Sequence, residues 1–219
     1  MTRTTGFGTM LCFLFACAGV ARADGFDVRP VTIEAHDGQA SFTVSNPGDI
    51  KIYMAVTVNE WTQDAGGRDV LRESSTAIAS PPGMWVGPRS SYMVRLRFPV
   101  PTGERESSYR VSVQNVPDRS QIAAGRVVFA VTQNLPAFSQ PANLSPPDLR
   151  GSLDGGKLRL TNNGGRRARI SGVAQDGRKL AEGLLGYALG GSSLMLDVRP
   201  HAGRVEVATD LGMRTLDIR

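Results

Sequence analysis

Apolar and polar residues alternate along several short runs of this chain, and turn-forming residues separate the runs. Between Pro81 and Pro117 two such runs follow each other, 94–98 (VRLRF) and 109–113 (YRVSV). The spacer between them carries Pro, Gly and the charged cluster 104–106 (ERE). Period-two alternation bounded by Pro and Gly is typical of strands that bury one face. We therefore expect two strands in this stretch.

Runs of the same kind lie on both sides of it. Upstream, 40–44 and 52–58 are strand candidates, and downstream 126–132 is a candidate with apolar residues on both faces. Together they make about seven short strands in roughly 115 residues, which is the spacing of an antiparallel sandwich. The segment 141–147 holds three prolines in seven residues and cannot extend a central strand. We interpret it as a linker, so that a first domain is expected at 24–140.

The remainder of the chain, 148–219, predicts a second, smaller β domain. No long amphipathic helix is evident in it, and 179–185 would make at most one or two helical turns. The expected fold class is therefore all-β, with two sandwich domains. The alternating runs of the second domain are 157–160, 168–173, 194–198, 204–207 and 216–218.

The composition agrees with a folded β protein. The 219 residues include 25 Gly and 13 Pro, which favour many turns. Hydrophobic residues make up 41% and charged residues 21%, enough to bury a core and unlike a disordered tail.

The first 23 residues have the pattern of a secretory signal peptide. Arg3 precedes an apolar run at 10–20, and Ala21-Arg22-Ala23 supplies a small-x-small cleavage site. We expect cleavage near Ala23 and no stable membrane insertion, because the apolar run is too short for a permanent spanning helix. Lipidation at Cys17 is the alternative, although Phe15 fits a lipidation box poorly.

Cysteine and charge narrow the chemistry further. Both cysteines, Cys12 and Cys17, lie in the leader, so the exported chain would have no disulfide, thiolate metal site or cysteine nucleophile. Loss of Arg3 and Arg22 lowers the formal net charge from +5 to +3. A charge this small gives no reason to expect nucleic acid as a partner.

No motif predicts an enzyme, a metal or a cofactor. The two histidines, His36 and His201, fall in different expected domains. The glycine pairs at 164–165 and 190–191 lack the Lys-Ser/Thr of a phosphate loop. Glu104 and Glu106 flank an arginine, so we interpret them as part of a structural ion-pair cluster.

Binding chemistry is better supported, at the strand candidate 126–132. Val127, Phe129 and Val131 share one face, and Val128 and Ala130 share the other. Such a strand is either covered on both faces or presents an apolar row to a partner. An exposed apolar edge is normally avoided, and where it is kept its natural use is pairing with another chain's strand. The pattern alone favours an ordinary core strand.

Several short motifs of the first domain occur together in a characteristic order: Pro81-Pro82, Gly87-Pro88, Met93-Val94-Arg95-Leu96, Glu104-Arg105-Glu106-Ser107 and Val116-Pro117. Their order and spacing resemble the periplasmic pilus, or fimbrial, assembly chaperone family. In the second domain, 160–164 (LTNNG) and 184–192 (LLGYALGGS) are similar to the branch that serves spore-coat-U-type, or archaic, fimbriae, and 61–63 (WTQ) also suits that branch.

The resemblance implies two immunoglobulin-like domains set at an angle, with a cleft between them, in a periplasmic protein. It implies a chaperone that captures pilus subunits lacking their last strand and delivers them to an outer-membrane usher. The chaperone would lend the final strand of its first domain, so that backbone hydrogen bonds and alternating apolar side chains complete the subunit. Each such side chain, once buried, contributes about 1.5–3 kcal/mol.

By this resemblance the donor strand is 126–135. Val127, Phe129 and Val131 form the inserting row, with Leu135 as a fourth member. The pattern leaves open whether the free protein self-associates through this edge.

The family's cleft usually holds two basic residues that bind the subunit's C-terminal carboxylate. Here the position in the last strand is Pro136 and the one in the first strand falls near Thr32, so Arg29, Arg95 and Arg97 become the anchor candidates. The usual Tyr-Arg-Pro ending of the last strand is 139–141 (SQP), so the family's interdomain arginine is also expected to be missing.

The function expected from the sequence is thus a non-enzymatic periplasmic chaperone for fimbrial subunits. The alternative is an exported two-domain immunoglobulin-like adhesion or structural module without strand donation. A degenerate chaperone-like protein, suggested by the missing basic anchor, is a third interpretation, and a hydrolase is a remote fourth.

Overall fold

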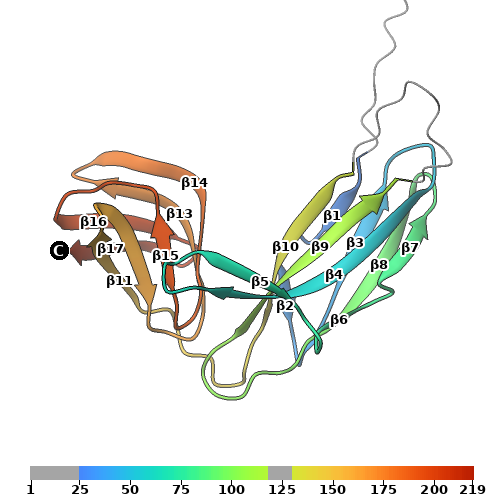
Figure 1. The fold of residues 1–219 in the computed structure, drawn as a ribbon, viewed down its shortest axis with the longest axis horizontal. Helices are drawn as coiled ribbons and strands as arrows, with labels where there is room; N and C mark the ends of the chain where they lie inside the picture. Colours follow the sequence, from blue (N-terminus) through green and yellow to red (C-terminus); the bar gives the residue numbers. More distant parts are fainter. Residues whose placement is uncertain (1–24, 118–129) are drawn as a thin grey trace, which may run out of the picture.

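The structure is a computed structural model and describes residues 25–117 and 130–219. Two β-sandwiches are set at an angle and meet in the middle of the molecule (Figure 1). Every regular element in the two described ranges is a strand, and no helix there is long and apolar enough to cross a membrane. The all-β class with two sandwich domains is therefore confirmed. The expected leader, Val127 and Phe129 lie outside the described residues.

The first sandwich has two sheets. The β8 sheet has the order β1-β3-β8-β6, formed by Asp27–Arg29, Gln39–Asn46, Ser90–Arg97 and Ile78–Ser80. The β10 sheet has the order β2-β10-β9-β4-β5, formed by Ile33–Ala35, Thr132–Ser139, Ser107–Val116, Ile52–Gln63 and Asp69–Glu73. Strand β7 (Gly83–Val86) pairs with the first part of β4. Strands β10 and β2 run parallel, and the other pairings of this sandwich are antiparallel.

Alternation explains how these strands bury one core between the two sheets. In β8, Val94 and Leu96 are 0% and 3% exposed, while Arg95 and Arg97 point to the outside. The expectation that the two arginines share the face opposite the apolar residues is confirmed. The larger members of the core include Phe42, Val44, Met54, Val56, Val94, Tyr109, Val111 and Leu135.

The second sandwich also has two sheets. One has the order β11-β12-β15, formed by Leu149–Asp154, Lys157–Asn162 and Ser193–Leu196. The other has the order β14-β13-β16-β17, formed by Arg178–Ala188, Ala168–Gln175, Gly203–Thr209 and Gly212–Ile218. Its core contains Leu158, Leu160, Ile170, Val205 and Val207, all fully buried.

The one or two helical turns that the sequence allowed at 179–185 do not form, because these residues belong to β14 and pair with β13 through irregular register. Gly183 and Gly186 in this strand have φ of 107° and 143°, which a helix does not accommodate. Of the last strand expected at 126–132, residues 126–129 lie outside the described residues, and β10 is described from Thr132 to Ser139.

Candidate functional site

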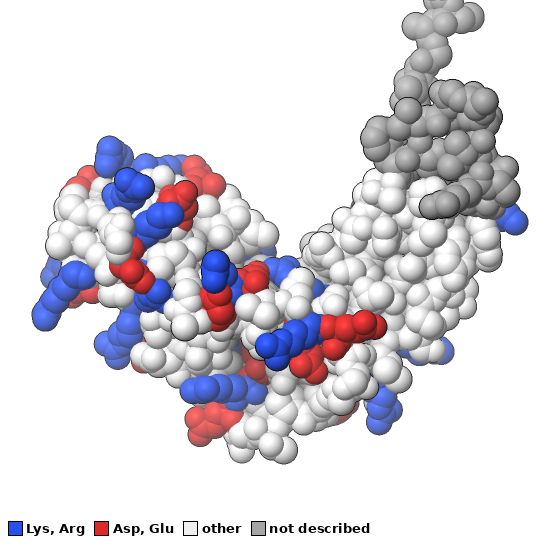
Figure 2. Space-filling model, viewed as in Figure 1, with Lys and Arg blue, Asp and Glu red and all other residues white. Residues whose placement is uncertain are grey.

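The β10 sheet turns part of its outer face toward the second domain. Val58 of β4 and Val111 of β9 point into the core, so the alternate positions Trp61 and Arg110 lie on the outer face, as does Phe138 of β10. On the face seen in Figure 2, charged side chains gather over the second domain and the joint. Much of the first domain's visible surface is uncharged.

An aromatic cluster forms the joint between the domains. Trp61 and Phe138 come from the first domain, and Tyr187 and Leu189 come from the second. The ring of Trp61 meets that of Tyr187 edge-on, with 5.4 Å between centroids and an interplanar angle of 82°. Phe138 lies 6.0 Å from Trp61 and 5.8 Å from Tyr187. These contacts remove four large side chains from water and hold the sandwiches together.

Arg110 is the cation of this outer face. Its guanidinium carbon lies 3.6 Å from the ring centroid of Trp61 and 5.8 Å from that of Tyr187. Asp69 approaches it at 3.6 Å, and the Arg110 side chain remains 20% exposed. Burial lowers the pKa of Arg110 from its usual value, against the opposing effect of Asp69. The residue therefore keeps a partly exposed, incompletely neutralised charge where the two domains meet.

A second arginine, Arg167, makes ion pairs and a stacking contact between the two domains. It extends from the second domain between two carboxylates of the first, Glu106 and Glu34. Its Nη1 donates to Glu106 Oε2 at 2.7 Å, and its backbone N–H donates to Glu106 Oε1, also at 2.7 Å. The guanidinium stacks 3.7 Å from the Phe138 ring centroid.

Electrostatics explains why this buried arginine stays charged. Burial opposes its charge, but the nearby carboxylates of Glu106 and Glu34 outweigh that effect and raise the pKa of Arg167. The expectation of a missing interdomain arginine is therefore corrected: the second domain supplies one. Gln140, at the position where the family usually has arginine, donates to Glu34 as well.

The β4–β5 hairpin makes a third connection between the sandwiches. Gln63 Nε2 donates to the carbonyl of Tyr187 at 2.8 Å, and Gln63 Oε1 accepts from the N–H of Leu189. At the hairpin tip, the carbonyl of Gly67 accepts from the N–H of Met195. Gly67 has φ of 76°, and a Cβ there would lie 2.7 Å from that nitrogen. Only glycine satisfies both constraints without displacement.

A hollow of about 390 Å³ also lies at the joint. Its lining has hydroxyl groups and the carboxylates of Glu60 and Glu106, with no lysine or arginine among the described residues. An anionic group is therefore better matched to Arg110 than to this hollow. Within the described ranges, no group of three His, Cys, Asp or Glu side chains could hold a metal ion.

Strand β10 has an open edge. It pairs with β9 along its whole length but with β2 only from Ala137 to Ser139. Among the described residues, Thr132–Pro136 thus have a strand neighbour on one side only. Asn115 N–H donates to the Val131 carbonyl, so the backbone groups of the odd-numbered residues from Val131 onward point toward β9. Pro136 is even-numbered, and its nitrogen therefore faces away from β9. The strand tolerates Pro136 because no ladder hydrogen bond to β9 is lost.

The structure separates the residues predicted for the donor strand. Val131, directly before β10, is 41% exposed, whereas Leu135 is 4% exposed and belongs to the core of the first sandwich. Both lie on the same strand face, because they are four residues apart. One apolar row thus runs from the surface into the domain's own interior.

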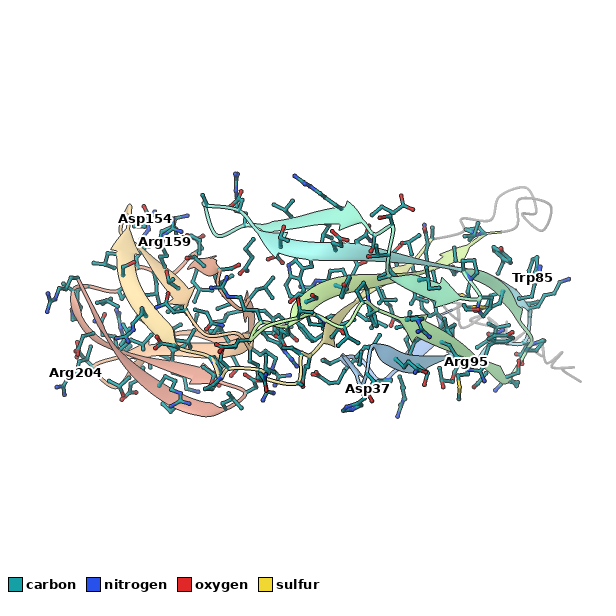
Figure 3. All side chains as sticks on the ribbon, turned by 90° about the horizontal axis from the view of Figure 1, so that it is seen from below. Asp37, Trp85, Arg95, Asp154, Arg159 and Arg204 are labelled. Carbon is teal, nitrogen blue, oxygen red and sulfur yellow. The ribbon has the colours of Figure 1, made fainter. Side chains whose placement is uncertain are left out.

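The three anchor candidates are placed elsewhere. Arg29 is exposed on β1, and Arg95 and Arg97 are exposed on β8, so all three belong to the β8 sheet and not to the sheet that meets the second domain. Figure 3 places Arg95 on the first sandwich, away from the second. The structure does not bring these arginines together with Val131 or with the joint.

Sequence reasoning missed Arg110 and Arg167. Arg110 stands in a predicted strand, and its parity already placed it opposite the core residue Val111, but nothing indicated that this face meets another domain. Arg167 follows the turn glycines Gly164 and Gly165 just before β13, where no periodicity marks it.

Comparison with known proteins decides the family. The family described as "Pili and flagellar-assembly chaperone, PapD N-terminal domain" matches residues 27–145. The chain belongs to this family. The resemblance seen in the sequence is thereby confirmed, and the family is one of chaperones rather than an enzyme class. Among curated protein sequences, none matches the chain.

Solved structures show the same fold in pilus chaperone systems. A chain of the CsuC–CsuE chaperone–tip adhesion subunit complex, from archaic chaperone-usher Csu pili of Acinetobacter baumannii, is 23% identical, with a TM-score of 0.73 over 89% of this chain and 99% of that one. A chain of the Salmonella enterica SafA pilin–SafB chaperone complex is 18% identical, with a TM-score of 0.69 over 90% and 97%. The Escherichia coli chaperone DraB is 16% identical, with a TM-score of 0.64 over 90% and 97%.

Proposed function

We propose that this chaperone-family chain binds pilus subunits in the periplasm, completes them with its own edge strand and delivers them to an outer-membrane usher. The observation that carries the proposal is the open edge of β10 at Thr132–Pro136, next to the exposed Val131. An unpaired edge offers backbone N–H and C=O groups to a partner strand, which is the physical requirement for β-augmentation.

In this proposal Val127, Phe129 and Val131 insert into the subunit's incomplete sandwich. Leu135 has a different role, because its side chain already fills the core of the first sandwich. It holds β10 in place while the part of the row before it is donated. Three inserted side chains together contribute about 5–9 kcal/mol before the cost of ordering is subtracted.

Arg110 takes the place of Arg29, Arg95 and Arg97 as anchor for the subunit's C-terminal carboxylate. It lies on the face of the β10 sheet that meets the second domain, and its cross-strand neighbour on β10 is the uncharged Pro136. A guanidinium forms bidentate hydrogen bonds with a carboxylate, so a single arginine can hold the chain end. Binding of the carboxylate to Arg110 would have to weaken the ion pair between Arg110 and Asp69.

Neither interaction requires a cofactor or nucleotide. Backbone pairing, apolar burial and one ion pair supply the binding free energy, and an incoming subunit's own strand would release the cargo. Export to the periplasm rests on the signal peptide pattern at 1–23.

Co-expression with a small secreted subunit encoded beside this gene tests the proposal. We expect Val131→Asp and Phe129→Asp to reduce recovery of soluble subunit, because a carboxylate cannot enter an apolar groove without a large desolvation cost. Met213→Asp is the matched control, since Met213 is 61% exposed on β17 of the second domain. Equal recovery with all three variants would show that strand donation is wrong and favour a structural or adhesion module.

A further inference from the structure

The outer face of the β8 sheet carries a cluster of arginines that the proposed chaperone site does not use. Arg29 of β1 stands opposite Thr43 of β3, and Thr43 stands opposite Met93 of β8. Arg95 and Arg97 follow Met93 at alternate positions on the same face. Strands lie about 4.8 Å apart and alternate residues about 6.7 Å apart, so the three arginines fall within roughly 17 Å of one another.

These three charges are not neutralised within the described part of the chain. None of the three arginines makes an ion pair or side-chain hydrogen bond there, whereas Arg68, Arg89, Arg110, Arg159 and Arg167 each have a carboxylate partner. Asp27, opposite Ser45 at the end of β1, is the one acidic residue that alternation places on the face. The other described positions between the arginines are Ser, Thr and Gln: Gln39, Ser41, Thr43, Ser45, Ser80 and Ser91.

Exposed apolar side chains lie beside the arginines. Met93 and Ile78 are 57% and 56% exposed. Two hollows of the described residues lie elsewhere, at the domain joint and in the second domain. A sheet face with guanidinium groups, short hydroxyl side chains and exposed apolar side chains matches an extended anionic surface better than a peptide, which requires a groove or a strand edge.

We propose that this arginine face, Arg29, Arg95 and Arg97 with Met93 and Ile78, is a docking surface for an anionic phospholipid membrane. The guanidinium groups pair with headgroup phosphates, and the apolar side chains rest at the interface without inserting a segment. The β8 sheet and the β10 sheet are separate layers of one sandwich, so docking of the arginine face does not use the backbone groups of the β10 edge. Docking would hold the protein at a membrane without occupying its subunit-binding edge.

Vesicle co-sedimentation of the mature protein tests this. The probes are vesicles of phosphatidylcholine alone and of phosphatidylcholine with phosphatidylglycerol, each at low and at physiological ionic strength. Since each arginine near an anionic surface contributes about 1 kcal/mol, Arg95→Gln/Arg97→Gln should lower partitioning onto the anionic vesicles about thirty-fold. Added salt should weaken binding by the parent protein. Circular dichroism spectra and unfolding midpoints of the variants should match the parent, because both side chains are exposed.

The matched control is Arg178→Gln/Arg214→Gln, which removes two exposed charges from the second domain. It should retain parental binding. Equal losses for both double variants, or equal binding of the parent to neutral and anionic vesicles, would overturn the proposal. So would a variant that keeps vesicle binding but recovers less subunit on co-expression, because the face would then serve an acidic protein. Failure of Val131→Asp to affect subunit recovery bears only on strand donation and leaves this test unaffected.

Discussion

The guanidinium of Arg110 lies against the indole of Trp61, with 3.6 Å from its carbon to the ring centroid. Trp61 is at the same time packed against Tyr187 of the second domain. The position of the Arg110 charge on the β10 sheet is therefore tied to the contact between the two sandwiches. A substitution at the joint should therefore change the position of the proposed anchor Arg110, and a substitution of Arg110 should change the packing at the joint.

Arg110→Ala should weaken subunit binding by about 10- to 100-fold, because a charge-assisted hydrogen bond contributes about 1.5–3 kcal/mol. Recovery of co-expressed subunit and titration of the purified complex would measure the loss. Arg72→Ala is the control, since Arg72 is an exposed arginine on β5 of the same sheet. Unchanged affinity in Arg110→Ala would remove Arg110 from the anchor role.

The two tryptophans offer a matched pair for the joint. Trp61 is 2% exposed between the domains, whereas Trp85 is 46% exposed at the far end of the first sandwich. Trp61→Ala should cost about 3–5 kcal/mol, as large-to-small changes in packed sites do. Trp85→Ala should cost about 1–2 kcal/mol, from the loss of a ring contact with Tyr53 and an exposed cation–π contact with Lys51. Urea unfolding followed by far-ultraviolet circular dichroism would compare them, and equal costs would contradict the assignment of Trp61 to the joint.

Arg167 and Glu106 should behave as a coupled pair. Arg167→Met leaves the buried carboxylate of Glu106 without its cation and should cost about 3–5 kcal/mol. Glu106→Gln should cost less, because Arg167 keeps its ion pair with Glu34. The double variant should cost less than the sum of the two, because each single variant already removes the contact between the two side chains. The unfolding free energies of the parent, the two single variants and the double variant together give the coupling energy in a double-mutant cycle. Strict additivity would mean that the two side chains act independently.

His201 should titrate above its usual value. The carbonyl of Ala202 and the carboxylate of Asp176, which lies 2.9 Å from Nε2, both raise the pKa of His201. The stabilisation is fully present below the unfolded-state pKa of about 6.5 and is lost as the pH rises through the folded-state value. Titration by NMR should give a lower pKa in Asp176→Asn than in the parent, while the Ala202 contact remains. An unchanged pKa would show that Asp176 does not pair with His201 in solution.

Alternation in the sequence was enough to predict four long strands of the first sandwich, β3, β4, β8 and β9, but not the short strands β1, β2, β5, β6 and β7. The runs at 94–98 and 109–113 fall in β8 and β9, and parity correctly opposed Arg95 to Val94. Alternation does not indicate which of the two outer sheet faces, that of the β8 sheet or that of the β10 sheet, contacts the second domain. For that reason Arg95 was preferred as an anchor over Arg110, although both occupy the same kind of outward position.

Other parts of the site were out of reach of local patterns. Arg167 lies just outside a strand, and its partners Glu34 and Glu106 are 133 and 61 residues away in the chain. Strand β14 contains good helix formers such as Lys179, Leu180 and Ala181, yet pairing with β13 decides its conformation. Tertiary contacts override local propensity in both cases.

The burial of Leu135 fixes which side chains along the open edge of β10 face inward and which face outward. Because Leu135 and Ala137 are fixed in the domain's own core, strand β10 cannot slide by a single residue without turning both to the wrong side. The exposed residue Val131 directly precedes this strand, and its carbonyl accepts from Asn115 of β9, so its side chain follows the same alternation. The free protein therefore already determines the register of this edge. Any partner strand that pairs with it must adopt the register that Leu135 and Ala137 impose.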